Sequence, residues 1–178
     1  MAKPQPYRKG ARRFFMGKIE VSCLFDSDYI NTAQFLIERA EREIFLSTFR
    51  LQIFNRLKSS KFLGLYSALI HALKRGVDVR VLTQFSAIPG KCPRSNTTSM
   101  RMLRDKGARV RFLSGGRIAH AKILCIDETY LISGSHNWSA SSLCQNFEFS
   151  VLARDPAQVA GARAHFLAAW DAAVDFAG

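Results

Sequence analysis

Hydrophobic and polar positions follow two periods along this chain, one typical of strands and one typical of helices. Short apolar runs bounded by turn residues predict strands at 19–25, 43–49, 77–83, 108–113, 118–126, 129–133 and 147–153. Apolar residues spaced three and four apart predict helices at 28–40, 60–75, 98–106 and 156–173. Because strands and helices alternate, we expect a single α/β domain with a mixed sheet flanked by helices on both faces.

The composition is that of a folded domain. The 178 residues are 48% hydrophobic and 11% aromatic, which excludes a disordered chain. No apolar run approaches the roughly 18 residues of a membrane span, and the apolar stretch within 12–18 is too short for a signal peptide. We therefore expect a basic N-terminal segment at 1–17, one domain over 18–178, no stable membrane insertion and a cytoplasmic location.

The positive charge is concentrated in the middle of the chain. The net charge is +12, and residues 50–122 carry sixteen basic residues against only Asp78 and Asp105. Such a block predicts a polyanionic partner, either nucleic acid or an anionic lipid surface, and charge alone does not choose between them. The candidate nucleic-acid contacts are Arg50, Arg56, Lys58, Lys61, Lys91, Arg94 and Arg117.

Two residues of the predicted strand 118–126 carry candidate chemistry. His120 and Lys122 are two positions apart and therefore share one face of a strand, beside aliphatic neighbours such as Ile118 and Leu124. A partly buried ammonium among aliphatic side chains is costly unless an anion meets it, which favours an anion-binding site. The alternative is an edge strand that presents both side chains to solvent.

Two short motifs follow this strand. In the run Gly-Ser-His-Asn at 134–137, the glycine permits a tight turn, and Ser135 and Asn137 can place a hydroxyl and an amide beside the same site. Glu148 then lies between two aromatic residues at the start of a strand, where an imidazole N–H could serve as its partner. Each motif alone is common in turns and strand ends. His71, His136 and His165 are interpreted as structural or surface residues.

Together, in this order, the motifs resemble the signature of the phospholipase D superfamily, H-x-K-x4-D followed by G-S-x-N and N-x-E. The matching residues are His120, Lys122, Asp127, Gly134, Ser135, Asn137, Asn146 and Glu148. One copy in a short chain resembles the single-motif branch, which holds small bacterial endonucleases and Zucchini-type nucleases. The chain lacks the zinc-binding Cys/His insertion of Zucchini-type proteins, so a small prokaryotic nuclease is the better fit.

The resemblance implies cleavage of a phosphodiester in two steps through a phosphohistidine. His120 would be the nucleophile, and Glu148 would accept a hydrogen bond from its ring and fix the tautomer. Lys122 and Asn137 would hold the non-bridging phosphate oxygens and stabilise the developing charge, with Ser135 assisting.

The residue inventory argues against a bound metal. No metal and no other cofactor is expected, because acidic residues are scarce in the basic block and two-metal sites need several carboxylates. Asp127, one residue past the strand, should face away from His120 and fix the turn. A single motif supplies one histidine, so the family's chemistry implies a homodimer with a shared active site.

Three functions remain open from the sequence. The leading one is a metal-independent endonuclease that acts on DNA or RNA, single- or double-stranded. The second is a phospholipase D, cardiolipin hydrolase or phosphatidyltransferase that uses the same site. The third is a nucleic-acid-binding module with a vestigial site, although a purely electrostatic binder has no need of Glu148 beside His120.

Overall fold

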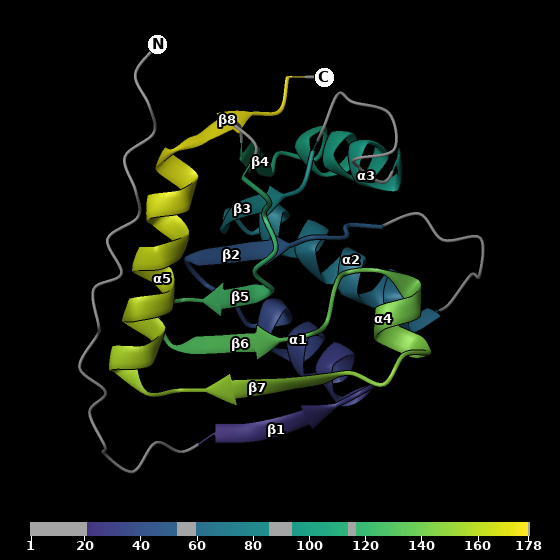
Figure 1. Ribbon diagram of the computed structural model, residues 1–178, viewed down its shortest axis with the longest axis vertical. Coiled ribbons are helices and arrows are strands. Elements are labelled where there is room, and N and C mark those ends of the chain that lie inside the picture. The colour runs from purple at the N-terminus through teal and green to yellow at the C-terminus, as the bar shows by residue number, and fades with distance from the viewer. Residues whose placement is uncertain (1–20, 53–59, 86–93, 114–116, 178) are drawn as a thin grey trace.

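The computed structural model describes residues 21–52, 60–85, 94–113 and 117–177; the basic segment expected at 1–17 lies outside these ranges. Within them, eight strands form one sheet in the order β1-β7-β6-β5-β2-β3-β4-β8 (Figure 1). The strands are β1 (Val21–Phe25), β2 (Glu43–Thr48), β3 (Asp78–Thr83), β4 (Arg109–Leu113), β5 (Ile123–Ile126), β6 (Tyr130–Gly134), β7 (Phe149–Ala153) and β8 (Ala173–Asp175). Strands β2, β3 and β4 pair in parallel and the other pairs are antiparallel, so the sheet is mixed, as predicted.

Helices cover both faces of the sheet, which confirms the predicted fold class. The helices are α1 (Asp28–Glu38), α2 (Ser60–Lys74), α3 (Arg94–Arg104), α4 (Ala140–Cys144) and α5 (Pro156–Asp171). Residues of α1, α2 and α3 share one hydrophobic core with the sheet, and residues of α5 share another. Figure 1 shows α5 running along the left side of the picture, across the ends of the central strands, with α1 and α2 behind the strands.

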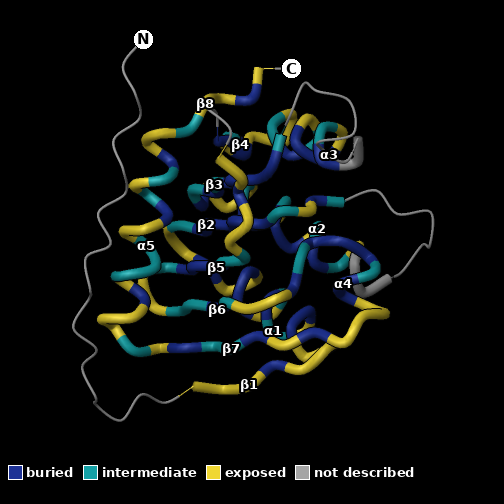
Figure 2. The backbone as a smooth tube through the Cα atoms, in the orientation of Figure 1, coloured by how far each residue is buried: buried dark blue, intermediate teal, exposed yellow. Residues whose placement is uncertain are grey.

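The two cores follow from alternation along the central strands. In β2, Ile44 and Leu46 belong to the core beneath α1 and α2, whereas Phe45 points to the other face and stacks on Phe166 of α5. A strand buried on both faces needs apolar residues at successive positions, which explains the continuous apolar runs of the sequence. Figure 2 shows these central strands as the most deeply buried part of the backbone.

Local expectations differ from the structure in three places. Helix α3 begins at Arg94, four residues before the predicted start at 98, and the short helix α4 and strand β8 were not predicted. Helix α4 is a five-residue turn whose preceding residue, Ser139, accepts a hydrogen bond from the N–H of Ser142. Strand β8 exists because it pairs with β4, where Asp175 meets Arg111 at 2.7 Å, and a window of local sequence does not reveal such a distant partner.

Four neighbouring strands, β2, β5, β6 and β7, begin or end in one row across the sheet. The register pairs Ser47 at the end of β2 with Ile123 at the start of β5, and Ile123 with Ser133 near the end of β6. Gly134 then pairs with Ser150 near the start of β7. All the motif residues except Asp127 lie within a few positions of this row.

Candidate active site

The segment that carries His120 is not part of a strand. The sequence predicts a strand over 118–126, but β5 begins only at Ile123, so the first half of that prediction was wrong. Ile123 pairs with Ser47, and β2 ends one residue later at Thr48. In these antiparallel registers β2 and β6 each extend only one residue beyond the partner of Ile123, so among the described residues the two strands offer the segment before Lys122 no further ladder.

Side-chain hydrogen bonds fix this segment where a strand would use ladder hydrogen bonds, and they come from three strands or strand ends. The contacts are Ala119 N–H donating to Gln84 Oε1 (3.0 Å), Ser47 Oγ donating to the Ala121 carbonyl (2.9 Å) and Ser133 Oγ donating to the Lys122 carbonyl (3.2 Å). The side chain of Ala119 is also buried. The backbone on both sides of His120 is thus fixed by polar groups that come from β2, β6 and the residue after β3.

His120 and Lys122 lie together, as their spacing predicts. The Lys122 ammonium donates to the His120 carbonyl at 2.8 Å, and its nitrogen lies 3.2 Å from both ring nitrogens of that histidine. The His120 side chain is exposed, and the ring of Phe49 lies 5.2 Å from it, centroid to centroid. Burial lowers the pKa of Lys122, an effect that the nearby carboxylate of Glu148 opposes. An exposed imidazole beside an ammonium can meet a phosphate group.

Glu148 lies at the centre of a hydrogen-bond network. Its carboxylate accepts hydrogen bonds from the Ser135 hydroxyl, from the Ser142 hydroxyl (2.8 Å) and from the Asn146 amide (3.1 Å), and the residue is only 8% exposed. Burial alone would raise the pKa of Glu148, but these hydrogen bonds, aided by nearby His136, outweigh it and the pKa is lowered. The site therefore stabilises the ionised carboxylate.

The pairing expected between Glu148 and His120 is not found in the described chain. There, the His120 ring is joined to Lys122, and the Glu148 carboxylate is joined to Ser135, Ser142 and Asn146. A backbone hydrogen bond explains the position of Glu148. Ser135 N–H donates to the carbonyl of Phe149 at 2.9 Å, which brings the Ser135 hydroxyl next to the Glu148 carboxylate.

Gly134 has a different role from the one predicted. It lies within β6 and makes no tight turn. A side chain at this position would collide with the Phe149 carbonyl and with Ser150 on β7. Glycine is therefore required because β7 approaches closely, and this approach places Ser135 against Glu148.

Asn137 is anchored by its amide oxygen. Its Oδ1 accepts the Arg50 N–H at 3.0 Å and lies 3.4 Å from the Thr48 hydroxyl, and its backbone N–H donates to Ser142 Oγ at 2.8 Å. None of the hydrogen bonds among the described residues uses the two N–H donors of the Asn137 amide. Those donors are the groups that Asn137 can offer to a ligand.

Asp127 lies at the other end of β5, away from His120. Its carboxylate accepts three backbone N–H groups, those of Glu41 (2.8 Å), Arg42 (2.8 Å) and Glu43 (3.0 Å). Its φ of +52° places it in the left-handed region that a turn residue adopts. This geometry agrees with the structural role predicted for Asp127.

Sequence reasoning missed three residues of the site's support. Asn96, fully buried on α3, accepts Leu51 N–H (3.0 Å) and donates to the carbonyls of Phe49 (2.9 Å) and Gln84 (3.0 Å). Gln84 in turn holds the N–H of Ala119. The polar pair Thr-Gln at the end of a buried strand was the available signal for Gln84. The signal for Ser142 was the group of three serines within 139–142, typical of a helix start.

The three histidines interpreted as structural or surface residues differ in their surroundings. His136 is buried, lies 2.8 Å from Ser150 Oγ and 3.0 Å from the Asp26 carbonyl, and stacks on Tyr29 at 4.5 Å. Burial lowers the pKa of His136. His136 therefore anchors the loop between Ser135 and Asn137 from the protein interior.

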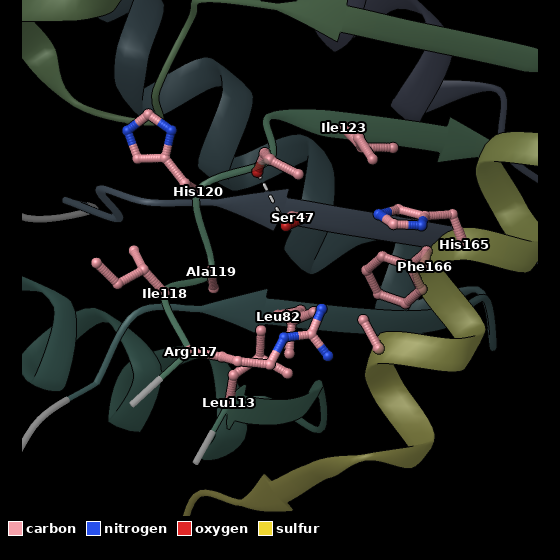
Figure 3. A pocket seen from close by; sticks show the side chains of 12 residues that line it. Ser47, Leu82, Leu113, Arg117, Ile118, Ala119, His120, Ile123, His165 and Phe166 are labelled. Carbon is pink, nitrogen blue, oxygen red and sulfur yellow. Dashed lines mark hydrogen bonds between the residues drawn. The ribbon is translucent and has the colours of Figure 1, made fainter. Parts of the chain in front are cut away.

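The candidate basic contacts are only partly described. Arg56, Lys58 and Lys91 lie outside the described residues, as do the side chains of Lys61 and Arg94. Arg50 and Arg117 are exposed, and both lie beside the site, since Arg50 contacts Asn137 and Arg117 lines a pocket with His120 (Figure 3).

In the described ranges, no three His, Cys, Asp or Glu side chains gather as metal ligands, and no helix is long and apolar enough to cross a membrane.

Comparison with known proteins gives a consistent family. Residues 35–170 match the family described as "Cardiolipin synthase, PLD-like domain". The chain is 31% identical over 118 residues to phospholipase D Z of Dictyostelium discoideum. This match covers 63% of this chain and 27% of that protein. It is 34% identical over 107 residues to the mitochondrial cardiolipin hydrolase of Danio rerio, and this match covers 58% of this chain and 43% of that protein. The chain thus spans less than half the length of these curated relatives.

Solved structures share the fold over nearly the whole chain. The phospholipase D family member Nuc from Salmonella typhimurium superimposes with a TM-score of 0.74 at 20% identity, covering 90% of this chain and all of that one. NucT from Helicobacter pylori gives 0.72 at 18% identity, covering 89% and 100%. At these identities the similarity shows a common fold.

Proposed function

The chain belongs to the phospholipase D-like family, and from this premise we propose that it is a metal-independent phosphodiesterase that cleaves nucleic acid through a phosphohistidine, as a homodimer. The observation that carries the proposal is the exposed imidazole of His120 with the Lys122 ammonium 3.2 Å from its ring nitrogens. A nucleophile beside a cation is the minimum that attack on an anionic diester requires.

In the first step, a ring nitrogen of His120 attacks phosphorus, a P–N bond forms, and the P–O bond to the leaving group breaks. The Lys122 ammonium and the N–H donors of the Asn137 amide, which no described residue engages, stabilise the charge that develops on the non-bridging oxygens. In the second step, a water oxygen attacks phosphorus, the P–N bond breaks, and His120 is regenerated.

Both steps need a second group that gives and takes a proton. The leaving oxygen must be protonated in the first step, and water must be deprotonated in the second. We assign this role to His120 of the partner subunit in a two-fold dimer. Exposed aromatic side chains beside Glu148 support such an interface: Phe147 is 93% exposed, and Phe25 and Phe149 form a pair with ring centroids 5.6 Å apart.

Glu148 and Ser135 act together in this proposal. The Ser135 hydroxyl is committed to the carboxylate, so its direct assistance to phosphate is secondary to its role in holding Glu148. The ionised Glu148 raises the pKa of Lys122 against the effect of burial and thereby favours its cationic form. Glu148 thus offsets part of the effect of burial on the phosphate-binding ammonium.

The basic block at 50–122 supports nucleic acid as the substrate, because a polyanion matches sixteen basic residues better than a single headgroup does. Lipid is the second candidate, because both curated relatives are named for lipid phosphodiesterases, a phospholipase D and a cardiolipin hydrolase. Both substrates would use the same phosphodiester chemistry at His120.

The test incubates the purified chain, with excess EDTA, with labelled single- and double-stranded DNA and RNA and, separately, with cardiolipin vesicles. We expect cleavage of nucleic acid that survives EDTA and is absent in His120→Ala, a variant that should still bind the same oligonucleotides. Cleavage that strictly requires added Mg²⁺ or Mn²⁺ would reject the histidine mechanism. Hydrolysis of vesicles alone would transfer the proposal to the lipid substrate.

A further inference from the structure

Asp26 lies in the turn between β1 and α1, outside every motif that the sequence analysis singled out. Figure 1 shows β1 as the outermost strand of the sheet, beside β7. The register pairs Phe25 with Phe149, so the next residues along the two chains, Asp26 and Glu148, lie opposite each other. A residue outside the motifs therefore lies against the backbone of Glu148.

The contacts between Asp26 and Glu148 are those of a ladder pair in which a side chain replaces one carbonyl. In a hydrogen-bonded antiparallel pair, each residue donates its N–H to the carbonyl of the other. Asp26 N–H donates to the Glu148 carbonyl at 3.1 Å, as in such a pair, but Glu148 N–H donates to Asp26 Oδ1 at 2.9 Å. Both backbone groups of Glu148 are thus bonded to one residue.

The backbone conformation of Asp26 explains the replacement. Its φ of +46° lies in the left-handed region, where the chain leaves the direction of the strand. The Asp26 carbonyl accepts a hydrogen bond from Nε2 of the buried His136 at 3.0 Å. Because a carbonyl can only accept, Nε2 carries the proton, and Nδ1, 2.8 Å from Ser150 Oγ, accepts from that hydroxyl. With its carbonyl engaged by His136, Asp26 meets Glu148 N–H with its side chain.

Asp26 therefore joins two segments of the site. His136 belongs to the run 134–137, which also carries Ser135, and Glu148 directly precedes β7. The Ser135 hydroxyl donates to the Glu148 carboxylate, a contact that requires the two segments to keep their relative position. A shift of either segment would separate the hydroxyl from the carboxylate.

We propose that Asp26 is a positioning residue of the active site, whose side-chain oxygen holds Glu148 where its carboxylate meets Ser135. The inference rests on the proposed phosphodiesterase function and deepens it. Asp26 is exposed, so water and salt screen its charge, and the place of its oxygen decides its role. Without that oxygen, Glu148 N–H loses the acceptor that fixes it.

Displacement of Glu148 should weaken the chemical step more than substrate binding. Glu148 opposes the effect of burial on the pKa of Lys122, and the Lys122 ammonium stabilises charge on the phosphate oxygens in the proposed mechanism. Affinity for nucleic acid comes mainly from the basic block. Loss of the Asp26 oxygen should therefore lower kcat about tenfold and change KM by no more than about twofold.

Three substitutions separate the oxygen of Asp26 from its charge. Asp26→Asn keeps an oxygen at the same reach without the charge, Asp26→Glu keeps the charge but moves its oxygens one carbon further out, and Asp26→Gly removes the side chain. Asn and Gly tolerate the left-handed region, and Glu128 shows that Glu adopts it in this fold, at a φ of +55°. Asp28→Ala is the matched control, because Asp28 Oδ2 accepts Phe25 N–H in the same turn, at 3.3 Å, and so holds β1 instead of Glu148.

Steady-state cleavage of a labelled oligonucleotide in EDTA, below the lowest melting temperature of the set, gives kcat and KM for each variant. We expect Asp26→Gly and Asp26→Glu to lower kcat about tenfold, and Asp26→Asn to stay within about threefold of wild type. Asp28→Ala should stay within about twofold. In a Glu148→Gln background, Asp26→Gly should change kcat less than about twofold, because a residue that acts through Glu148 then has no carboxylate to position. Where Asp26→Gly does not fold, Asp26→Glu takes its place in both comparisons.

Several results would overturn the inference while leaving the proposed function intact. One is unchanged kcat in folded Asp26→Gly and Asp26→Glu, and another is an equal loss in Asp26→Asn, which would assign the effect to charge. A further tenfold loss on top of Glu148→Gln would show that Asp26 acts independently of Glu148. If wild type cleaves cardiolipin vesicles and not oligonucleotides, the same variants are compared on vesicles. No cleavage of either substrate by folded wild type would reject the proposed function and this inference together.

Discussion

The two halves of the candidate site are built in opposite ways. Ser135 and Glu148 lie at the ends of paired strands, in a network that buries the carboxylate and meets it with three hydrogen bonds. His120 and Lys122 instead lie on a segment outside the sheet ladder and are held by side chains from elsewhere. The difference separates support from chemistry: the supporting half is buried and satisfied, whereas the reacting half is accessible to substrate.

Each construction has a physical reason. A buried carboxylate without partners is strongly destabilising, so the half that contains Glu148 needs a dense and regular frame. A nucleophile must present a ring nitrogen to phosphorus, which a side chain packed inside a sheet cannot do. Leaving the ladder at Ile123 exposes His120, and Gln84 and Ser47 replace the orientation that the ladder would have supplied.

The largest effect is expected at the reacting half. His120→Ala should lower turnover about a thousandfold or more while leaving nucleic-acid affinity and melting temperature nearly unchanged, because the exposed ring supports little else. If two His120 side chains share one phosphate, purified mixed dimers of wild type and His120→Ala should be nearly inactive. Random reassortment of equal amounts should then leave about a quarter of the activity, against about half for independent sites.

This measurement requires proof that subunits exchange, for instance by co-expression with two different tags, since unmixed homodimers would also give half. Mixed dimers that retain half of wild-type activity would rule out the shared site. Full activity of a protein that is monomeric by light scattering would do so as well.

The second prediction tests whether Gln84 positions the nucleophile. Gln84→Met removes the acceptor that holds Ala119 N–H but is similar in size, and it should lower kcat about tenfold to a hundredfold with little change in KM. Gln84→Glu keeps an oxygen at the same reach and should retain more activity than Gln84→Met. Steady-state kinetics of both variants below their melting temperatures decide the matter; equal losses in the two would mean that Gln84 has only a packing role.

The third prediction concerns the supporting half. Glu148→Gln should destabilise the fold by about 1–3 kcal/mol at neutral pH, because hydrogen bonds to an ionised carboxylate are lost. The folded-state pKa of Glu148 is lowered, so its contribution is complete above the pKa of an unfolded Glu and disappears as pH falls through the folded value. Urea unfolding should therefore show the largest difference from wild type above about pH 5, shrinking in acid. A difference that grows in acid would contradict this assignment.

Sequence patterns predicted the parts of this molecule that depend on local periodicity. The mixed sheet with helices on both faces is confirmed, and the spacing of His120 and Lys122 predicted their contact. The sequence could not show that β5 begins at Ile123, because its start depends on where β2 ends. Gln84 and Asn96 were missed for the same reason: their partners Ala119 and Leu51 are 35 and 45 residues away and meet them only after folding.

The smallest effect is expected at Asp127, which belongs to the motif but not to either half of the site. Asp127→Asn keeps a residue that tolerates the observed φ of +52°, yet weakens three hydrogen bonds to backbone N–H groups. We expect a loss of about 1–2 kcal/mol in the free energy of unfolding and no more than about a twofold change in kcat. Denaturant unfolding and kinetics on the same preparation measure both.

Glu128→Gln is the matched control, since this neighbour also has a positive φ but makes only partly exposed ion pairs with Arg42 and Arg163, at 3.9 and 3.1 Å. Glu128→Gln should lower the free energy of unfolding by less than about 0.5 kcal/mol, because exposed ion pairs contribute little. The difference between the two variants separates two effects on stability. One is the loss of the hydrogen bonds from the backbone before β2 to the Asp127 carboxylate, and the other is the loss of a surface charge. If Asp127→Asn instead lowered kcat about a hundredfold in a protein that stays folded, Asp127 would act on the reacting groups, and the separation between the turn and the site would be wrong.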